Sequence, residues 1–288
     1  MSSRSTPPTS SPILFHLGYR LPDDLSTLSQ LRETRFVLLC GPSSRAYDIC
    51  NRLKRGPSPP DLCLTDRYTL LQPMPSVLVA AHGIGTGSVD VLLHELHIAL
   101  CEGGASDWSL LRVGSCGGLG VAPGTVVVTR RPLNGLFKNE LRMFILGEDV
   151  HMAASFDEKL SAALHTFGQK RMGEGCVTGD TVCAETFYLA QGRRDGAFCG
   201  FDAEQRHRFL RTCQEKGVVN FEMESLAIAA FATEMNVPAA MVCAVLVDRL
   251  QDETPTYDHD DLVEFQVRAV QLAIDYIMEQ IGVLPSRV

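Results

Sequence analysis

The feature that most constrains the fold is an alternation of short apolar runs with amphipathic helical segments along nearly the whole chain. Residues 35–40, 76–81 and 239–247 are dominated by apolar side chains over the length of a strand. The segments with a helical pattern are 88–101, 156–167, 221–235 and 260–281. Strands that alternate with helices in this way predict an α/β fold with a mostly parallel or mixed sheet.

Several predicted strands end in glycine-rich loops. Residues 35–40 stop at Gly41, residues 76–81 are followed by the glycines of 83–85, and the strand at 110–113 runs into 114–118, which reads GSCGG. Ligands of open α/β sheets bind at the carboxyl ends of the strands, so a binding site is expected at these loops. Along the last helix an apolar stripe predicts packing on the sheet.

The domain organisation is simple. No internal repeat or linker interrupts residues 13–288, which predicts one domain. Residues 1–12 are rich in Ser, Thr and Pro and are expected to form a disordered tail.

Composition narrows the class of protein. The formal net charge is −8, which argues against a nucleic-acid surface, and an anion site would need arginines concentrated locally. No apolar run approaches the roughly 20 residues of a membrane-spanning helix. The ten cysteines include no CxxC pair and read as reduced thiols, so a cytoplasmic location is expected. No Cys or His spacing typical of a metal site is present, and none is predicted.

Three arginines next to predicted strands are candidate anion ligands. Arg45 closes a turn that begins at Gly41, Arg67 lies in a charged triplet before an apolar run, and Arg112 stands inside an apolar strand just before Ser115. A buried charge is costly unless it is paired, so Arg112 needs a carboxylate partner or an anionic ligand. A plain turn for Arg45 and a solvated strand start for Arg67 remain alternatives. No Walker loop is present, and the glycines at 83–87 lack the dinucleotide-binding spacing.

Two later segments could recognise a ring and a sugar. Gln191 and Arg193 offer an amide beside a guanidinium, a pair that can bind the edge of a planar amide or imide, and Phe187 could stack on a ring. A polar surface loop is an equally good reading from spacing alone. The acids flanking Met223 could accept hydrogen bonds from sugar hydroxyls, although acids are also favoured at a helix start by the dipole.

The ordered set of motifs resembles the nucleoside phosphorylase-I superfamily, and within it the animal branch of the uridine phosphorylases. The matching segments are FHLG at 15–18, the GxxxR turn at 41–45, DRY at 66–68, RVGSCGG at 112–118, PGTVVVT at 123–129, TFYxxQGRxDGAFC at 186–199 and FEMES at 221–225. They run in order over nearly the whole chain.

The resemblance implies a single α/β domain whose central mixed β-sheet forms a distorted barrel flanked by helices. It implies reversible phosphorolysis of uridine to uracil and ribose 1-phosphate in pyrimidine salvage, with phosphate as co-substrate and no cofactor. It also implies a homo-oligomer, at least a dimer, in which His16 and Arg67 serve the neighbouring subunit's site. The implied roles are phosphate binding by Gly41, Arg45, Arg67, Arg112 and Ser115, ribose binding by His16, Met223 and Glu224, and uracil binding by Phe187, Gln191 and Arg193.

Departures from the family pattern keep alternatives open. Ser115 stands where the family usually has Thr, and Asp248-Arg249 stands where it usually has Asn-Arg. In purine-cleaving relatives an aspartate at that place protonates the leaving group, so Asp248 and Arg249 are candidate leaving-group or specificity residues. Tyr68 replaces a glutamate that binds a monovalent cation in bacterial relatives, and no such site is predicted. The alternatives are a purine nucleoside phosphorylase, a nucleosidase of the same fold, or a catalytically silent nucleoside-binding paralogue.

Overall fold

The centre of the fold is an eight-stranded sheet, seen in a computed structural model that describes residues 13–54 and 57–283. The strand order is β11-β10-β7-β12-β6-β3-β5-β4. The strands are β3 (Phe36–Cys40), β4 (Thr69–Met74), β5 (Val77–Ala81), β6 (Ser109–Gly118), β7 (Val126–Leu133), β10 (Cys176–Cys183), β11 (Val218–Glu222) and β12 (Ala239–Asp248). Every residue of β3 and β5 is buried, as their apolar runs predict.

The sheet closes on itself at one end. β11 pairs in parallel with β10 and also antiparallel with β6, where Asn220 and Phe221 lie opposite Gly118 and Gly117. β6, β12, β7, β10 and β11 therefore form a closed ring of mixed strands. The predicted fold, a single α/β domain with a mixed sheet forming a distorted barrel, is confirmed. The predicted tail at 1–12 lies outside the described residues.

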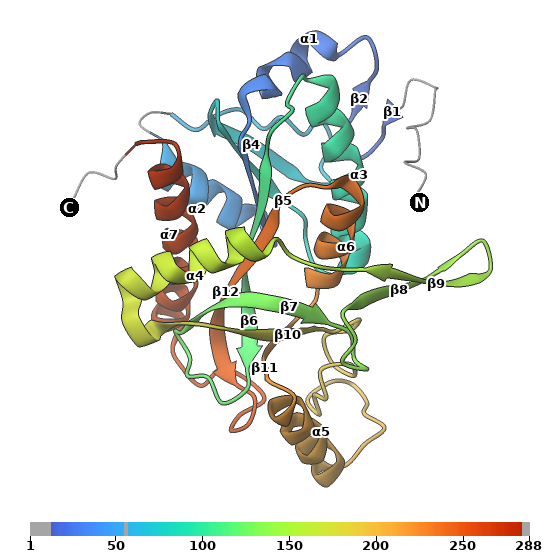
Figure 1. Cartoon of the computed structure of the whole chain (residues 1–288), viewed down its shortest axis with the longest axis vertical. Helices are drawn as coiled ribbons and strands as arrows, with labels where there is room; N and C mark the ends of the chain where they lie inside the picture. The colour runs from blue at the N-terminus through green and yellow to red at the C-terminus, as the bar shows by residue number, and fades with distance from the viewer. Residues whose placement is uncertain (1–12, 55–56, 284–288) are drawn as a thin grey trace.

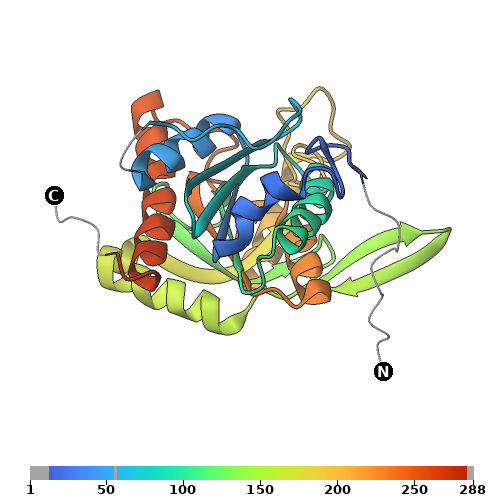
Figure 2. The same cartoon turned by 90° about the horizontal axis from the view of Figure 1, so that it is seen from above.

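Helices cover both faces of the sheet (Figures 1 and 2). One face is covered by α2 (Ser43–Leu53), α4 (Glu158–Met172) and α7 (His259–Gln280), and the other by the short α1 (Leu25–Leu28), α3 (Thr86–Glu102) and α6 (Ser225–Met235). α5 (Ala203–Glu215) packs beside β11 at the barrel end. The middle of the α7 stripe, from Val270 to Ile277, is buried against the sheet, whereas Val263 near the start of the helix is exposed. No helix in the described part of the chain is both long and apolar enough to cross a membrane.

The helix predicted at 221–235 begins four residues later in the structure than the sequence pattern indicated. Phe221 and Glu222 belong to strand β11, and α6 starts only at Ser225. Two of the β11 residues pair with β6 and four with β10, so tertiary pairing overrides the local helical pattern. The difference matters because it places Glu222 at the end of a strand and Glu224 at the start of a helix.

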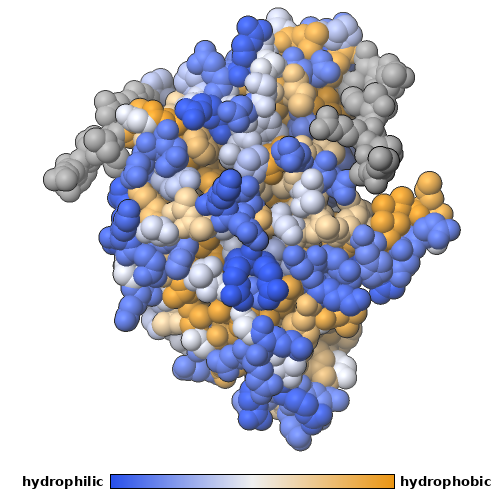
Figure 3. Space-filling model, viewed as in Figure 1, coloured by the Kyte–Doolittle hydropathy of each residue, from blue (hydrophilic) through white to orange (hydrophobic). Residues whose placement is uncertain are grey.

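A two-stranded hairpin that the sequence analysis did not predict projects from the body (Figure 1). It consists of β8 (Glu140–Ile145) and β9 (Glu148–Ala153). Three apolar side chains at its tip are exposed, and Figure 3 shows this apolar surface at the end of the arm: Phe144, Ile145 and Leu146.

Strand register brings the glycine loops together. β3 runs parallel to both β5 and β6, with Cys40 opposite Ala81 and Val113. The chain after each strand therefore emerges at one edge. Gly41 accepts a backbone hydrogen bond of 2.9 Å from Gly83, and a Cβ on Gly41 would lie only 3.1 Å from the Gly83 carbonyl oxygen. A side chain at position 41 would crowd this approach, so glycine keeps the two loops close.

Candidate active site

A cavity of about 520 Å³ opens at this edge of the sheet. Its wall combines strand ends, the first turn of α2, the β11–α6 junction and the loops at 184–202 and 249–258. Of the thirteen candidate residues from the sequence, ten line it: Gly41, Arg45, Arg112, Ser115, Phe187, Gln191, Arg193, Met223, Glu224 and Arg249. Candidate residues as much as 208 positions apart in sequence, Gly41 and Arg249, thus meet in one site.

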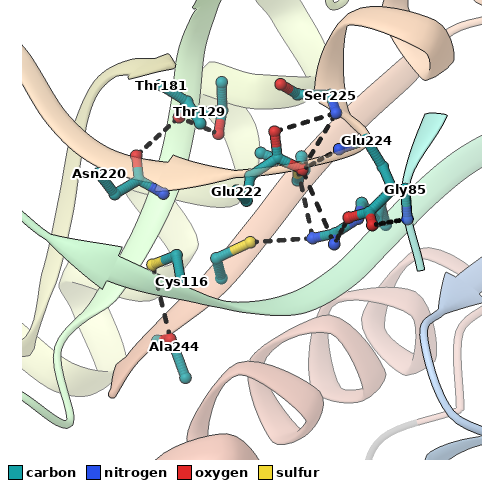
Figure 4. Close-up of polar contacts among 12 residues, drawn as sticks. Gly85, Cys116, Thr129, Thr181, Asn220, Glu222, Glu224, Ser225 and Ala244 are labelled. Carbon is teal, nitrogen blue, oxygen red and sulfur yellow. Dashed lines mark hydrogen bonds and ion pairs between the residues drawn. The ribbon is translucent and has the colours of Figure 1, made fainter. Parts of the chain in front are cut away.

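Arg112 is a buried charge of the cavity wall, next to the carboxylates of Glu222 and Glu224 that Figure 4 shows. It is 5% exposed, its guanidinium bonds directly to Glu224, and Nη2 lies 3.7 Å from Glu222 Oε2. Nη1 also lies 3.1 Å from the Cys243 sulfur. Burial opposes the charge, but Glu224 and the groups around it outweigh burial and hold the pKa of Arg112 above its ordinary value. The carboxylate partner that the desolvation argument required is therefore present.

Glu224 is held with both oxygens engaged. Oε1 accepts a 2.6 Å hydrogen bond from the Gly85 amide, and Oε2 binds Arg112. Burial raises the pKa of Glu224, but Arg112 and the amide outweigh that effect and leave it below the usual value. An ionised carboxylate with remaining lone pairs can accept hydrogen bonds from vicinal hydroxyls.

Glu222, one of the two acids considered for binding sugar hydroxyls, has a structural role that the sequence did not indicate. Its carboxylate accepts hydrogen bonds from the backbone amides of Glu224 (2.8 Å) and Ser225 (3.0 Å) at the start of α6. Burial raises its pKa, and Arg112 opposes that shift. Glu222 thus fixes the β11–α6 junction that carries Glu224. The available signal was an acid just before a helix, which is common enough to be uninformative alone.

Arg45 brings a second guanidinium to the same end. It lies in the first turn of α2, and its side chain bonds to Gln266 of α7. Burial lowers the pKa of Arg45, and the nearby charge of Arg112 lowers it further. The two guanidiniums, of Arg45 and Arg112, repel each other and would be stabilised by a bound polyanion. Ser115 lines the same cavity.

The other end of the cavity, next to Gly117 and five residues along β6 from Arg112, holds an amide and two guanidiniums. Gln191 and Arg193 are 5% and 6% exposed, and Arg249 is fully buried. Arg249 donates to the Gln191 side-chain oxygen (3.4 Å) and backbone carbonyl (3.1 Å). Arg193 makes a two-point pair with Asp195 and stacks over the Phe187 ring at 4.5 Å. Burial, together with the neighbouring arginines, lowers the pKa of Arg249 to about 10.

Three candidate residues do not line the cavity. The Nδ1 atom of His16 is 2.7 Å from Glu95 and its side chain is 42% exposed, while Arg67 is exposed on an adjacent loop. The carboxylate of Asp248 points into a backbone turn, where it accepts from the amides of Gly120 (2.9 Å) and Leu250 (3.1 Å). In this position Asp248 does not face a base in the cavity, which weakens the argument for purine cleavage.

Comparison with known proteins agrees with the geometry. The model of the phosphorylase superfamily matches residues 35–281. Uridine phosphorylase 1 of Mus musculus is 34% identical over 258 residues, covering 87% of this chain and 83% of the mouse protein. Uridine phosphorylase 2 of Homo sapiens is 37% identical over 223 residues, covering 77% and 70%.

A solved structure extends the agreement to three dimensions. The uridine phosphorylase of Schistosoma mansoni in complex with uracil superposes with a TM-score of 0.89 at 29% identity, covering 96% of this chain and 97% of that one. The chain belongs to the phosphorylase superfamily and, within it, to the uridine phosphorylases.

Proposed function

We propose that the chain catalyses the reversible phosphorolysis of uridine to uracil and ribose 1-phosphate. The observation that carries the proposal is one cavity with two chemically distinct ends. Arg45 and Arg112 supply a cationic end for phosphate, and Gln191 with its neighbouring guanidiniums supplies a polar end for a pyrimidine edge. Glu224 lies at the first end and is suited to the ribose diol.

These groups match the charges that develop in the reaction. As the glycosidic bond breaks, C1′ gains oxocarbenium character and uracil leaves as an anion. Phosphate held by the arginines stabilises the cation and then attacks C1′, while Gln191 and Arg193 stabilise charge on the uracil oxygens. Glu224 fixes the sugar's orientation. The reaction is a substitution without electron transfer, so phosphate is the only co-substrate we propose, with no metal or organic cofactor.

A substrate comparison tests the proposal. We expect the purified protein to cleave uridine in the presence of phosphate, with thymidine and deoxyuridine as further pyrimidine substrates to compare. Uracil release is followed by the change in ultraviolet absorbance, with inosine as the purine control and phosphate-free buffer as the hydrolysis control. Cleavage of inosine alone would indicate a purine phosphorylase. Phosphate-independent cleavage would indicate a nucleosidase, and no cleavage a silent paralogue.

The second part of the proposal is a homodimer with shared sites. His16 and Arg67 lie on adjacent loops, since the Leu64 amide donates to the Leu17 carbonyl (2.9 Å), and both lie outside this chain's own cavity. The exposed guanidinium of Arg67 and the part-exposed imidazole of His16 are in a position to contribute to a neighbouring subunit's site. The apolar hairpin tip is a surface of the type that association buries.

Subunit complementation tests the shared site. In a dimer, Arg67→Ala disables the partner's site and Glu224→Gln disables the subunit's own site, so each variant alone is expected to be nearly inactive. When the two are co-expressed, mixed dimers retain one intact site, and we expect roughly a quarter of the wild-type activity to return. The matched control combines Glu224→Gln with Arg112→Ala, two own-site changes that leave no intact site. Equal activities in both mixtures would contradict the shared site.

A further inference from the structure

The polar end of the cavity is formed by two loops that are far apart in sequence, and a helix supports both of them. The loop at 184–202 carries Gln191 and Arg193, the loop at 249–258 carries Arg249 and Pro255, and α5 lies beside both (Figure 1). Neither loop contains a strand or helix. Their relative position therefore depends on side-chain and turn contacts rather than on a backbone ladder.

Glu253 connects all three segments. Its Oε2 accepts a 2.7 Å hydrogen bond from the backbone amide of Arg194, and its Oε1 lies 3.2 Å from Nε of Arg206 on α5. Arg206 in turn donates a 2.9 Å hydrogen bond to the carbonyl of Arg249. The Glu253 and Arg206 side chains are 26% and 12% exposed, so the ion pair is largely shielded from solvent. Glu253 itself does not line the cavity.

The same carboxylate balances an arginine cluster. Arg193, Arg206 and Arg249 are all largely buried, and the two carboxylates that oppose them are Asp195 and Glu253. Burial and the other two arginines lower the pKa of Arg249, while Glu253 and Asp195 raise it. Guanidiniums this close repel one another, so the two carboxylates are needed to hold them together at the base-binding end.

We propose that Glu253 is a positioning residue for the base-binding end of the site. It holds the turn that carries Arg249 against the segment that carries Gln191 and Arg193, and it acts through them without touching the substrate. The inference rests on the proposed uridine phosphorolysis. It predicts that loss of the Glu253 charge impairs departure of the base and leaves phosphate binding intact.

The test is steady-state kinetics of Glu253→Gln. The amide keeps the side chain's size and can still accept from the Arg194 amide, but it no longer pairs as an ion with Arg206. We expect kcat/KM for uridine to fall about 10-fold, the scale of one partly shielded charge-assisted contact, with KM for phosphate unchanged. With 5-fluorouridine, whose base is a better leaving group, the deficit is expected to be smaller.

Two further variants make the result specific. Glu204→Gln removes an exposed ion pair with Arg208 on the same helix, at 84% and 71% side-chain exposure, and is expected to leave the kinetics unchanged. Glu253→Asp keeps the charge and should recover part of the lost activity. If Glu253→Gln folds poorly, the Asp variant still tests whether the carboxylate is needed.

Two outcomes would overturn the inference: Glu253→Gln kinetics matching those of Glu204→Gln, or an equal loss with uridine and 5-fluorouridine. Wild-type protein that failed to cleave uridine would instead overturn the proposed function on which the inference rests.

Discussion

Arg112→Ala is expected to lower kcat/KM for uridine phosphorolysis by about 1000-fold, the upper range for loss of one preorganised charged group. Arg112 is a buried cation of the cavity wall, on the strand that also carries Ser115. Its loss removes a proposed phosphate ligand and the cation that lowers the pKa of Glu224. Initial rates measured over a matrix of uridine and phosphate concentrations would show the effect, chiefly as a higher KM for phosphate.

The stability of this variant must be measured alongside its activity. Removing one member of a buried ion pair leaves an uncompensated carboxylate and costs about 3–5 kcal/mol. Arg171→Ala is a suitable control, because Arg171 pairs with Asp275 at 2.6 Å on the helices away from the cavity. It should lower the unfolding midpoint while the folded enzyme keeps its activity. A folded Arg112→Ala enzyme with near wild-type phosphorolysis would show that the phosphate site is assigned wrongly.

Gln191→Leu is expected to lower kcat/KM for uridine by about 100-fold or more, since a site built to hydrogen-bond a substrate loses heavily when a polar partner is removed. The leucine cannot bind a pyrimidine edge, and it leaves a buried Arg249 N–H without the acceptor it has at 3.4 Å. The preference for uridine over inosine should shrink, while KM for phosphate should stay unchanged. Initial rates with both nucleosides would measure this.

A matched change elsewhere separates base recognition from general damage. Gln30→Leu alters an exposed glutamine whose amide binds the Thr27 carbonyl in the α1 region, outside the cavity. It is expected to leave both substrate preference and rate unaltered. If Gln191→Leu behaved like Gln30→Leu, the uracil would have to be recognised by other groups.

Much of the site could be predicted because its residues follow strands in short, recognisable segments. Gly41, Arg112 and Ser115 stand at or near the carboxyl ends of apolar runs, and parallel strands bring those ends to one edge. Because Arg112 stands inside an apolar strand, the sequence alone predicted that its charge has an acidic partner or an anionic ligand. The resemblance to the family assigned the uracil-binding and ribose-binding roles, and all of those residues except His16 line the same cavity.

Some acidic residues have roles that the sequence did not indicate, and the physical reason is the same for each of them. Glu222, Asp195 and Glu253 act by accepting hydrogen bonds from backbone amides or by pairing with arginines, and acids near helix starts or in polar loops are ordinary in any sequence. Their importance arises only from what lies opposite them. The same holds for Asp248, whose family position suggested contact with the base, whereas its carboxylate binds the amides of Gly120 and Leu250.

The sequence by itself determined the α/β class, the arginines and the segment from Gln191 to Arg193, because periodicity, burial of charge and residue chemistry are local properties. Only the tertiary structure decided that β11 closes the barrel, that Glu222 ends a strand, and that Arg249 reaches Gln191 across 58 residues. Those outcomes depend on which strands pair and which charges meet at long range. A one-dimensional pattern contains the groups but not the distances between them.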